Sequence, residues 1–225
     1  KDLFVENDIV YMKTVKGPLK VDCIYRRLDD NYLDPKVFNK NSVIGVPGLF
    51  KSWRKGNVGI LNAPGTGIAD DKVVYSYVNK MIVYYLGEQP ILNQVETYLC
   101  YNEKQKKYVI DNISKLVVKP ANASGGYGIM IGPNAKKKEI NEVIKKIKNN
   151  PREFIAQPLE TLSTAPTITD KDIEPRHLDL RPFVLSGKST YVTTGGLTRV
   201  ALRKGSTIVN SSQGGGSKDT LIVDV

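Results

Sequence analysis

The chain has 225 residues, of which 40% are hydrophobic and 25% are charged, and it can therefore bury a core in one large domain or in two small lobes. No apolar run approaches the roughly 20 residues of a membrane-spanning helix, and no charged-then-apolar leader opens the chain, so we expect a cytoplasmic protein without a membrane partner. The net charge of +10 indicates an anionic partner, with nucleic acid, an anionic membrane surface and the phosphates of a small ligand as candidates.

The first hundred residues predict strands followed by a helix. Apolar and β-branched residues predict strands at 4–12 and 20–26, around a Lys-Gly-Pro turn, and a start within a strand indicates a missing upstream part. A short strand at 58–61 runs into the turn Asn-Ala-Pro-Gly-Thr-Gly. A helix is predicted from Asp70 to Leu86, because acidic residues favour its N-terminal end and a glycine follows its last residue.

The middle of the chain predicts an alternation of helices and strands. A helix at 103–112 precedes a strand at 115–119, and a strand at 127–131 precedes a second helix at 134–149 and a strand at 154–157. The lysines of the second helix alternate with branched apolar residues at helical spacing. This pattern is typical of a helix with one buried face and one solvated face.

Beyond residue 160, four runs at 177–185, 189–194, 197–203 and 207–210 alternate with glycine turns and predict an antiparallel meander. The coarse fold class is therefore α+β. The lysines and arginines outside the second helix are scattered, without the interleaved aromatic residues of a single-strand binding groove. Nucleic acid therefore ranks below a small phosphate-bearing ligand as the anionic partner.

The segment from Leu116 to Ile131 carries the strongest chemical signal. An apolar strand ends in Lys119, which is followed by the rigid Pro120 and by a loop of small residues with three glycines. Such a loop lets backbone N–H groups close on phosphate oxygens, beside which the lysine supplies positive charge. An ordinary glycine hairpin with an exposed lysine is the alternative, but a lysine at the strand end favours phosphate binding. No Gly-Lys-Ser/Thr follows the glycines, so this is not a Walker loop.

The segment at 118–128 resembles the Lys-Pro and glycine-loop element of ATP-grasp enzymes. Together with further phrases, it is similar to the bacterial circularly permuted ATP-grasp proteins, a group related to glutathionylspermidine synthetase. The resemblance covers nearly the whole chain, in the order and at the spacing of that family. The further phrases lie at residues 25–30, 62–72, 175–183, 195–201 and 210–220.

The resemblance implies an α+β ATP-grasp fold, circularly permuted, in which two lobes hold ATP between them. The larger lobe would comprise residues 1–100, with the helix of the first lysine, and residues 161–225, with the antiparallel sheet. The smaller lobe, with the glycine loop, would comprise residues 101–160. The chain would then be a fragment of a longer protein that lacks its N-terminal part.

The resemblance also implies a nucleotide site. Lys72 and Lys119 match the two lysines that reach the nucleotide phosphates from opposite sides. For Lys72 the alternative is a solvated lysine in the first turn of a helix, where a cation is disfavoured unless an anion offsets it. The strand at 154–157 resembles the hinge strand of the family, whose backbone pairs with the adenine edge. The other implied nucleotide-binding residues belong to the glycine loop, to this hinge strand and to the segment after it: Ser124, Gly125, Gly126, Gly128, Gln157 and Glu160.

Arg181 and Arg199 are the candidate catalytic residues. Each lies within a short apolar strand, where a buried guanidinium needs an anion, and a phosphate or acyl-phosphate oxygen is a suitable bidentate partner. A structural pair such as Asp179 with Arg181, or an exposed position on the open face of the sheet, is the alternative. The small-residue tail at 210–218 repeats the pattern of the glycine loop. His177 is expected to pack or bond locally, because the implied chemistry needs no base.

The reaction implied by the family is the ATP-dependent joining of a carboxylate, on a small molecule or a peptide, to an amine through an acyl-phosphate. The cofactors are ATP and Mg²⁺, and the protein supplies alignment and positive charge. Two alternatives stay open. One is an ATP-binding module without turnover in this truncated form, and the other is a basic domain that binds nucleic acid or another polyanion.

The sequence assigns no metal ligand. The Glu-x-Asn phrase of ATP-grasp enzymes is not formed at Asn62, because Ile60 stands two residues before it. Four aspartates are candidate stand-ins, each more often a surface or paired carboxylate than a ligand: Asp29, Asp30, Asp179 and Asp219. The two cysteines, in a chain with a single histidine, are expected to be reduced thiols and not zinc ligands.

Overall fold

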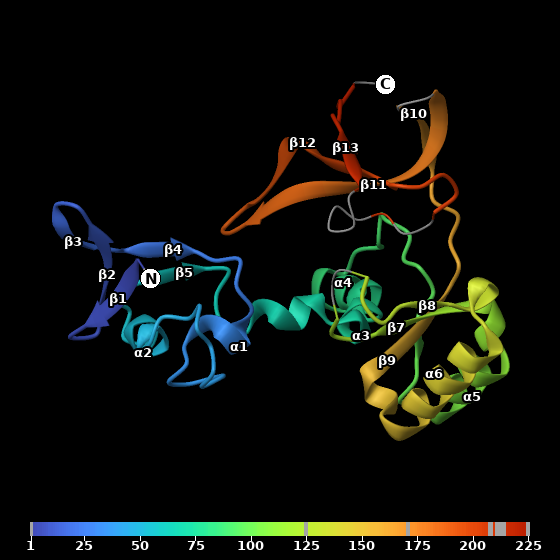
Figure 1. The fold of residues 1–225 in the computed structure, drawn as a ribbon, viewed down its shortest axis with the longest axis horizontal. Helices are drawn as coiled ribbons and strands as arrows, with labels where there is room; N and C mark the ends of the chain where they lie inside the picture. The colour runs from blue at the N-terminus through green and yellow to red at the C-terminus, as the bar shows by residue number, and fades with distance from the viewer. Residues whose placement is uncertain (1, 124–125, 170–171, 207–208, 210–214, 224–225) are drawn as a thin grey trace. The chain divides into compact units, whose positions relative to one another are not determined.

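The computed structural model describes residues 2–123, 126–169, 172–206, 209 and 215–223. The chain divides into two compact units, Lys1–Leu86 and Gly87–Val225, each with helices, strands and a hydrophobic core of its own (Figure 1). The mixed helix-and-sheet class is thus confirmed, whereas the lobe boundaries at residues 100 and 160 stay a prediction. Within the described ranges, no helix is long and apolar enough to cross a membrane.

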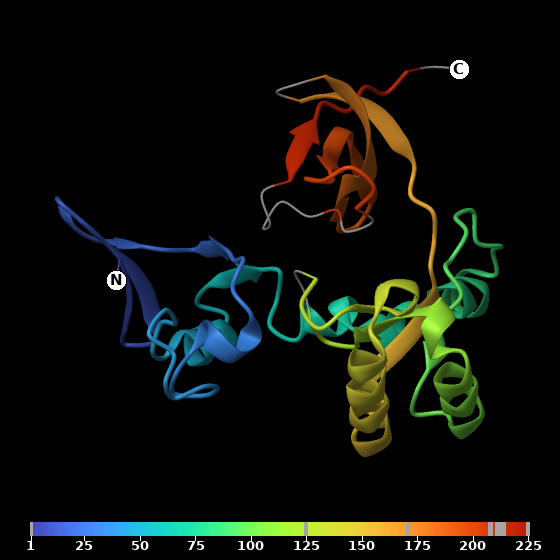
Figure 2. The same cartoon turned by 45° about the vertical axis from the view of Figure 1, so that its right-hand side comes forward.

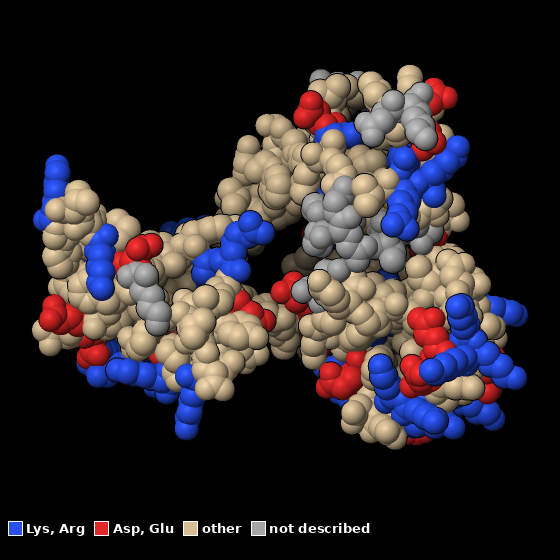
Figure 3. Space-filling model, viewed as in Figure 1, with Lys and Arg blue, Asp and Glu red and all other residues tan. Residues whose placement is uncertain are grey.

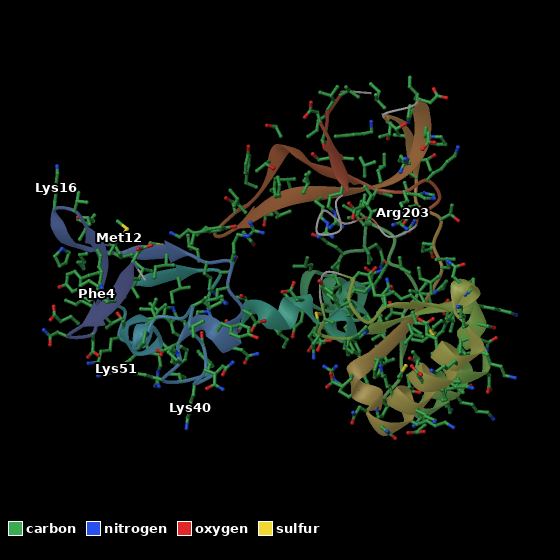
Figure 4. All side chains as sticks on the ribbon, in the orientation of Figure 1. Phe4, Met12, Lys16, Lys40, Lys51 and Arg203 are labelled. Carbon is green, nitrogen blue, oxygen red and sulfur yellow. The ribbon has the colours of Figure 1, made fainter. Side chains whose placement is uncertain are left out.

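The first unit opens with a three-stranded antiparallel sheet of β1 (Leu3–Glu6), β2 (Ile9–Thr14) and β3 (Gly17–Lys20). The prediction of one strand at 4–12 is wrong, because Asn7 and Asp8 form a tight turn with φ of 49° and 61°. Asparagine and aspartate adopt this left-handed conformation more readily than other non-glycine residues, so they allow a two-residue hairpin. Figure 4 shows Lys16 at the tip of the next hairpin, between β2 and β3.

A parallel strand pair and two short helices complete the core of the first unit. They are β4 (Cys23–Tyr25), β5 (Gly59–Leu61), α1 (Asp30–Leu33) and α2 (Leu49–Arg54). The predicted strand at 20–26 is wrong as a single element, since β3 pairs with β2 and β4 pairs separately with β5. The strand expected at 58–61 is confirmed as β5. Apolar side chains from these elements, from β2 and from the residue before β5 form the buried core: Val10, Leu33, Leu49, Val58 and Ile60.

The helix predicted at 70–86 is broken. A 3-10 turn at Thr66–Asp70 precedes α3 (Lys72–Tyr75), and α4 (Val78–Leu86) follows after a turn. At the break, the Ser76 hydroxyl donates a hydrogen bond to the carbonyl oxygen of Val73 over 2.7 Å. Such side-chain bonds compete with the helical ladder. Asp71, and not Asp70, caps α3, because its carboxylate accepts from the backbone N–H of Val73.

The second unit contains a four-stranded antiparallel sheet with helices on one side. The strand order is β6 (Tyr98–Leu99), β9 (Phe154–Pro158), β7 (Leu116–Pro120) and β8 (Met130–Ile131). Both α5 (Glu103–Asp111) and α6 (Lys137–Asn149) lie on the same side of this sheet (Figures 1 and 2). β8 is shorter than the strand predicted at 127–131, because residues 126–128 turn with glycines of positive φ. α6 begins later than predicted, after a 3-10 turn at Gly132–Asn134.

Strand alternation gives this sheet two different faces. One face packs on the helices in a buried core to which four strand residues contribute: Leu116, Val118, Met130 and Ala156. The residues between them, paired across the same ladders, share the opposite face: Val117, Lys119, Ile131 and Gln157. Gln157 is paired with Val117, so its side chain is a diagonal neighbour of Lys119 on that face.

The basic helix α6 has the two faces that its sequence predicts. Ile140, Val143, Ile144 and Ile147 pack on the core of the sheet, and Ile147 is fully buried. The lysines of the helix are exposed. Figure 3 shows carboxylates among the cations over the region of α5 and α6, and Lys106 of α5 pairs with Glu103 at 2.7 Å. This surface is a solvated helix face of mixed charge.

A second antiparallel sheet follows, with the order β10 (Thr164–Ile168), β11 (Ile173–Ser186), β12 (Thr190–Val200) and β13 (Gly216–Lys218). The meander is confirmed, but β12 runs through the predicted turn between 194 and 197. Gly196 pairs with Pro182 within the ladder, and a Cβ there would lie 2.8 Å from the carbonyl oxygen of Arg181. Gly196 therefore allows the two strands to approach closely and does not form a turn. The strand expected at 207–210 lies outside the described residues except for Val209.

Candidate functional site

A cavity of about 420 Å³ lies within the second unit. Its wall includes residues of both sheets of that unit and of the segments beside β9. The polar lining comprises several of the residues predicted from the sequence: Lys119, Gln157, Glu160, Arg181 and Arg199. Gly126 of the glycine loop lines it too, and most of the remaining wall is aliphatic, with Val117 and Ile131 from the open face of the β7–β9 sheet. The structure thus brings residues far apart in sequence to one cavity.

Two residues of the lining, Lys119 and Gln157, form a partly buried hydrogen-bonded pair. Lys119 Nζ donates to Gln157 Oε1 over 2.7 Å, and Gln157 is only 8% exposed. Gln157 Nε2 in turn donates over 2.9 Å to the hydroxyl of Thr97, which donates to the carbonyl oxygen of Val95. Thr97 was not predicted from the sequence. Its only signal is its place one residue before β6, where continuing the β6–β9 register sets it opposite Gln157.

The glycine loop requires glycine at its described positions. Gly126 and Gly128 have φ of 81° and 71°, a conformation that residues with a Cβ rarely adopt. A Cβ on Gly128 would also lie 2.9 Å from Cγ of Pro120, directly after Lys119. Gly128 therefore shapes the turn without lining the cavity. The predicted residues Ser124 and Gly125 lie outside the described residues.

The two arginines share one carboxylate. Asp179 pairs with Arg199 in the β11–β12 ladder, and its Oδ1 accepts from Arg199 Nε over 2.9 Å while its Oδ2 accepts from Arg199 Nη2. Arg181 Nε lies 3.6 Å from Asp179 Oδ2 and its side chain is 56% exposed, against 15% for Arg199. The alternative of an Asp179–Arg181 pair therefore holds in weaker form, because the principal partner of Asp179 is Arg199.

The charges of this cluster reinforce one another. Burial acts to raise the pKa of Asp179, but the hydrogen bond and charge of Arg199, with a contribution from Arg181, outweigh it and lower that pKa. The hydrogen bond to Asp179 raises the pKa of Arg199. The cluster is therefore an ionised triad with two positive charges and one negative charge, and a net positive charge remains at the wall of the cavity.

Lys72 belongs to the first unit, at the start of α3, and its convergence with Lys119 stays a prediction. Its side chain is half-buried. Burial lowers the pKa of Lys72, and the charges of Asp71 and Asp70 oppose that shift without cancelling it. A partly desolvated ammonium is stabilised by a nearby anion.

Two of the four candidate metal ligands have other partners in the first unit. Asp29 caps α1 through the backbone N–H of Asn31. Asp30 forms an ion pair with Arg26 at 2.6 Å and accepts from the backbone N–H of Gly65. Among the described residues, no group of three or more His, Cys, Asp or Glu side chains gathers into a metal site. Glu160 is the carboxylate of the cavity lining, and a protein ligand set for Mg²⁺ is not assigned.

The remaining single residues do not line the cavity. His177 Nδ1 lies 2.8 Å from the carbonyl oxygen of Leu162, so it bonds locally. Cys23 and Cys100 form no disulfide, and burial raises the pKa of the Cys100 thiol to about 11. Asp219 is exposed after β13.

Comparison with known proteins identifies the family. Residues 1–201 match the family described as circularly permuted ATP-grasp type 2. An uncharacterized protein of Synechocystis sp. is 54% identical over 224 residues, which is 99% of this chain and 47% of that protein. An uncharacterized protein of Mycobacterium tuberculosis is 51% identical over 99% of this chain and 41% of its own length. A protein of Frankia casuarinae, named provisionally as a glutamate–cysteine ligase, is 48% identical over 98% of this chain and 26% of its own length.

The chain thus spans about half of the length, or less, of these curated relatives. The match begins at the first residue and continues through the glycine loop, the hinge strand and both arginines. The order of the sequence phrases predicted this result. The chain belongs to the circularly permuted ATP-grasp type 2 family.

Proposed function

We propose that the cavity of the second unit binds ATP, and that the chain is the nucleotide-binding part of an ATP-dependent carboxylate–amine ligase. The observation that carries the proposal is the convergence of Lys119, Arg181 and Arg199 on one cavity with an aliphatic wall. Cations suit the phosphates, and an apolar strip suits a purine base. The volume also fits, since small-molecule sites are commonly about 300–1,000 Å³.

The reaction would proceed in two steps. A carboxylate oxygen attacks the γ-phosphorus of ATP, the bond to the β–γ bridging oxygen breaks, and an acyl-phosphate and ADP form. An amine then attacks the acyl carbon, loses a proton and displaces inorganic phosphate, leaving an amide. The residues of the cavity would align the γ-phosphate and balance its charge in both steps.

The site has identifiable parts for this task. Lys119 and the arginine pair would contact phosphate oxygens, and Gly126 would let the loop backbone approach them. Lys72 would supply the second lysine from the first unit. Gln157 and Glu160, at the end of β9, would face the base and the ribose. Mg²⁺ would enter with the phosphates, which supply oxygen ligands themselves.

The relatives support the substrate class. The name of the Frankia casuarinae protein refers to a ligase that joins the carboxylate of one amino acid to the amine of another. An amino-acid or peptide carboxylate and an amino-acid amine are therefore the first substrates to test. The activity and the substrates of the whole, longer protein are proposals on this basis.

Calorimetric titration with Mg-ATP tests the nucleotide site. The chain should bind Mg-ATP, and Lys119→Ala should weaken binding by at least tenfold, because a charge-assisted bond to phosphate contributes about 1.5–3 kcal/mol. Lys115→Ala is the matched control, since Lys115 is exposed shortly before the same strand and does not line the cavity. Equal binding by all three proteins, or none by the unaltered chain, would contradict the proposal.

Two further measurements separate the alternatives. Release of ADP and phosphate that depends on both a carboxylate and an amine supports the ligase, whereas binding without turnover supports a nucleotide-binding module. Salt-sensitive binding of nucleic acid without any response to Mg-ATP would support the polyanion binder instead.

A further inference from the structure

We propose that Thr97 is a positioning residue that orients Lys119 through Gln157, in a hydrogen-bond relay whose direction is fixed at both ends. This inference rests on the proposed nucleotide site and adds a residue to it. Thr97 lies outside the polar lining of the cavity. Its hydroxyl connects that lining to the backbone of the segment before β6.

The direction of the relay follows from what each group can donate. An ammonium only donates, so the side-chain oxygen of Gln157 must face Lys119, at 2.7 Å. The amide nitrogen of Gln157 then faces Thr97, at 2.9 Å, and the hydroxyl oxygen of Thr97 accepts from it. The hydroxyl proton of Thr97 is therefore left for a second bond, which it donates to the carbonyl oxygen of Val95 over 3.0 Å.

The relay prevents an amide flip. A glutamine amide can reverse its oxygen and nitrogen with little change in shape. Reversal would turn the NH₂ group of Gln157 toward the ammonium of Lys119, where two donors would meet. The NH₂ group of the reversed amide would also lose the hydroxyl oxygen of Thr97 as its acceptor. Gln157 is 8% exposed, so water offers it little replacement.

The relay also leaves the charge of Lys119 intact. Gln157 is neutral, so it positions the ammonium without cancelling its positive charge, which a carboxylate in the same place would do. Arg199 differs in this respect, because it is held by the charged Asp179. The wall of the cavity thus contains one cation positioned by an amide and one positioned by a carboxylate.

Thr97→Val tests the relay, because valine keeps the shape and removes the hydroxyl. Affinity for Mg-ATP should fall about threefold to tenfold, as for the loss of one hydrogen bond, while affinity for adenosine, which lacks phosphates, should stay the same. Thr97→Ser, which keeps the hydroxyl, should bind Mg-ATP as the unaltered chain does. Thr167→Val is the matched control, since Thr167 is also half-buried and also donates to the carbonyl two residues before it, away from the cavity.

Gln157→Glu provides a second variant, which keeps the acceptor for Lys119 and adds a negative charge. Mg-ATP affinity should fall by more than tenfold at neutral pH, because the added negative charge offsets the charge of Lys119 beside the phosphates. Unchanged Mg-ATP affinity in both Thr97→Val and Gln157→Glu would overturn the inference. An equal loss of ATP and adenosine binding in Thr97→Val would also overturn it, since that result indicates a general structural defect.

A nucleotide-free measurement keeps the relay distinguishable from the proposed function. The side-chain NH₂ protons of Gln157, observed by ¹H–¹⁵N NMR, should exchange slowly with solvent in the unaltered chain and faster in Thr97→Val. Fast exchange in the unaltered chain would overturn the relay whatever the chain binds. Slow exchange without Mg-ATP binding would support the relay and contradict the nucleotide site.

Discussion

Asp179 on β11 and Arg199 on β12 are direct partners in their ladder, and the two carboxylate oxygens of Asp179 accept hydrogen bonds from two different nitrogens of Arg199. This arrangement holds the guanidinium of Arg199 in one plane at the wall of the cavity. Arg181, two residues further along β11, has its Nε 3.6 Å from the same carboxylate, but its side chain remains exposed. The three residues have different tolerances for substitution as a result.

Arg199→Lys should weaken Mg-ATP binding by roughly threefold to tenfold. A lysine has one nitrogen and cannot reproduce both bonds to Asp179, so the cation at the wall becomes less well positioned. Arg203→Lys is the matched control, because Arg203, labelled in Figure 4, is exposed and does not line the cavity. Titration of both variants checks the prediction, and equal affinities would show that a point charge is sufficient at Arg199.

The Asp179 carboxylate should contribute stability that depends on pH. Its pKa is lower in the folded chain than in the unfolded chain, so its contribution is fully present above the unfolded value of about 3.9 and is lost as the pH falls through the lower folded value. The difference in melting temperature between the unaltered chain and Asp179→Asn should therefore be largest near neutral pH and shrink below about pH 4. Asp219→Asn, at an exposed position, is the control. A difference that stays constant down to pH 3 would contradict this linkage.

Gly128→Ala should destabilise the glycine loop by about 2 kcal/mol, because alanine is strained at its φ of 71° and the added Cβ would also lie 2.9 Å from Pro120. Gly87→Ala separates these causes. Gly87 has a similar φ of 67°, and an added Cβ there meets no atom within 4 Å. Its loss should be about 1 kcal/mol. Denaturant unfolding of both variants checks the prediction, and equal losses would remove the role of the Pro120 contact.

Asp34→Asn should destabilise the first unit by about 3 kcal/mol. Asp34 is fully buried, and its carboxylate accepts from the backbone N–H groups of Lys36, Gly48 and Phe50. Asparagine replaces one oxygen by a donor, which leaves buried N–H groups without an acceptor. Hydrogen exchange of the α2 amides measures this loss.

Asp29→Asn is the matched control for Asp34. Asp29 caps α1 through the backbone N–H of Asn31 at the surface, and asparagine caps a helix as well as aspartate does. Its effect should stay within about 0.5 kcal/mol. Similar hydrogen exchange in the two variants would contradict the structural role of the Asp34 carboxylate.

Local chemistry explains which elements the sequence predicted correctly. The spacing of Ile140, Val143, Ile144 and Ile147 determines which face of α6 is buried, and the structure has that face on the core. Lys119, followed by Pro120 and the glycines, marks the end of β7 before any partner is known. The failures are also local in origin. Asn7 and Asp8 split an apolar run that reads as one strand, and the Ser76 hydroxyl bond lies at the break in the predicted helix.

The sequence by itself determined the family, the Lys119 loop and the arginines that line the cavity. Tertiary structure alone decided the partners. Lys119 pairs with Gln157, 38 residues away. Asp179 accepts its two close hydrogen bonds from Arg199, although Arg181 is closer to it in sequence. Thr97 became visible only through the register of β6 against β9. The physical reason is that a strand's own residues set which faces alternate, whereas cross-strand neighbours depend on ladder register, which is established between distant segments.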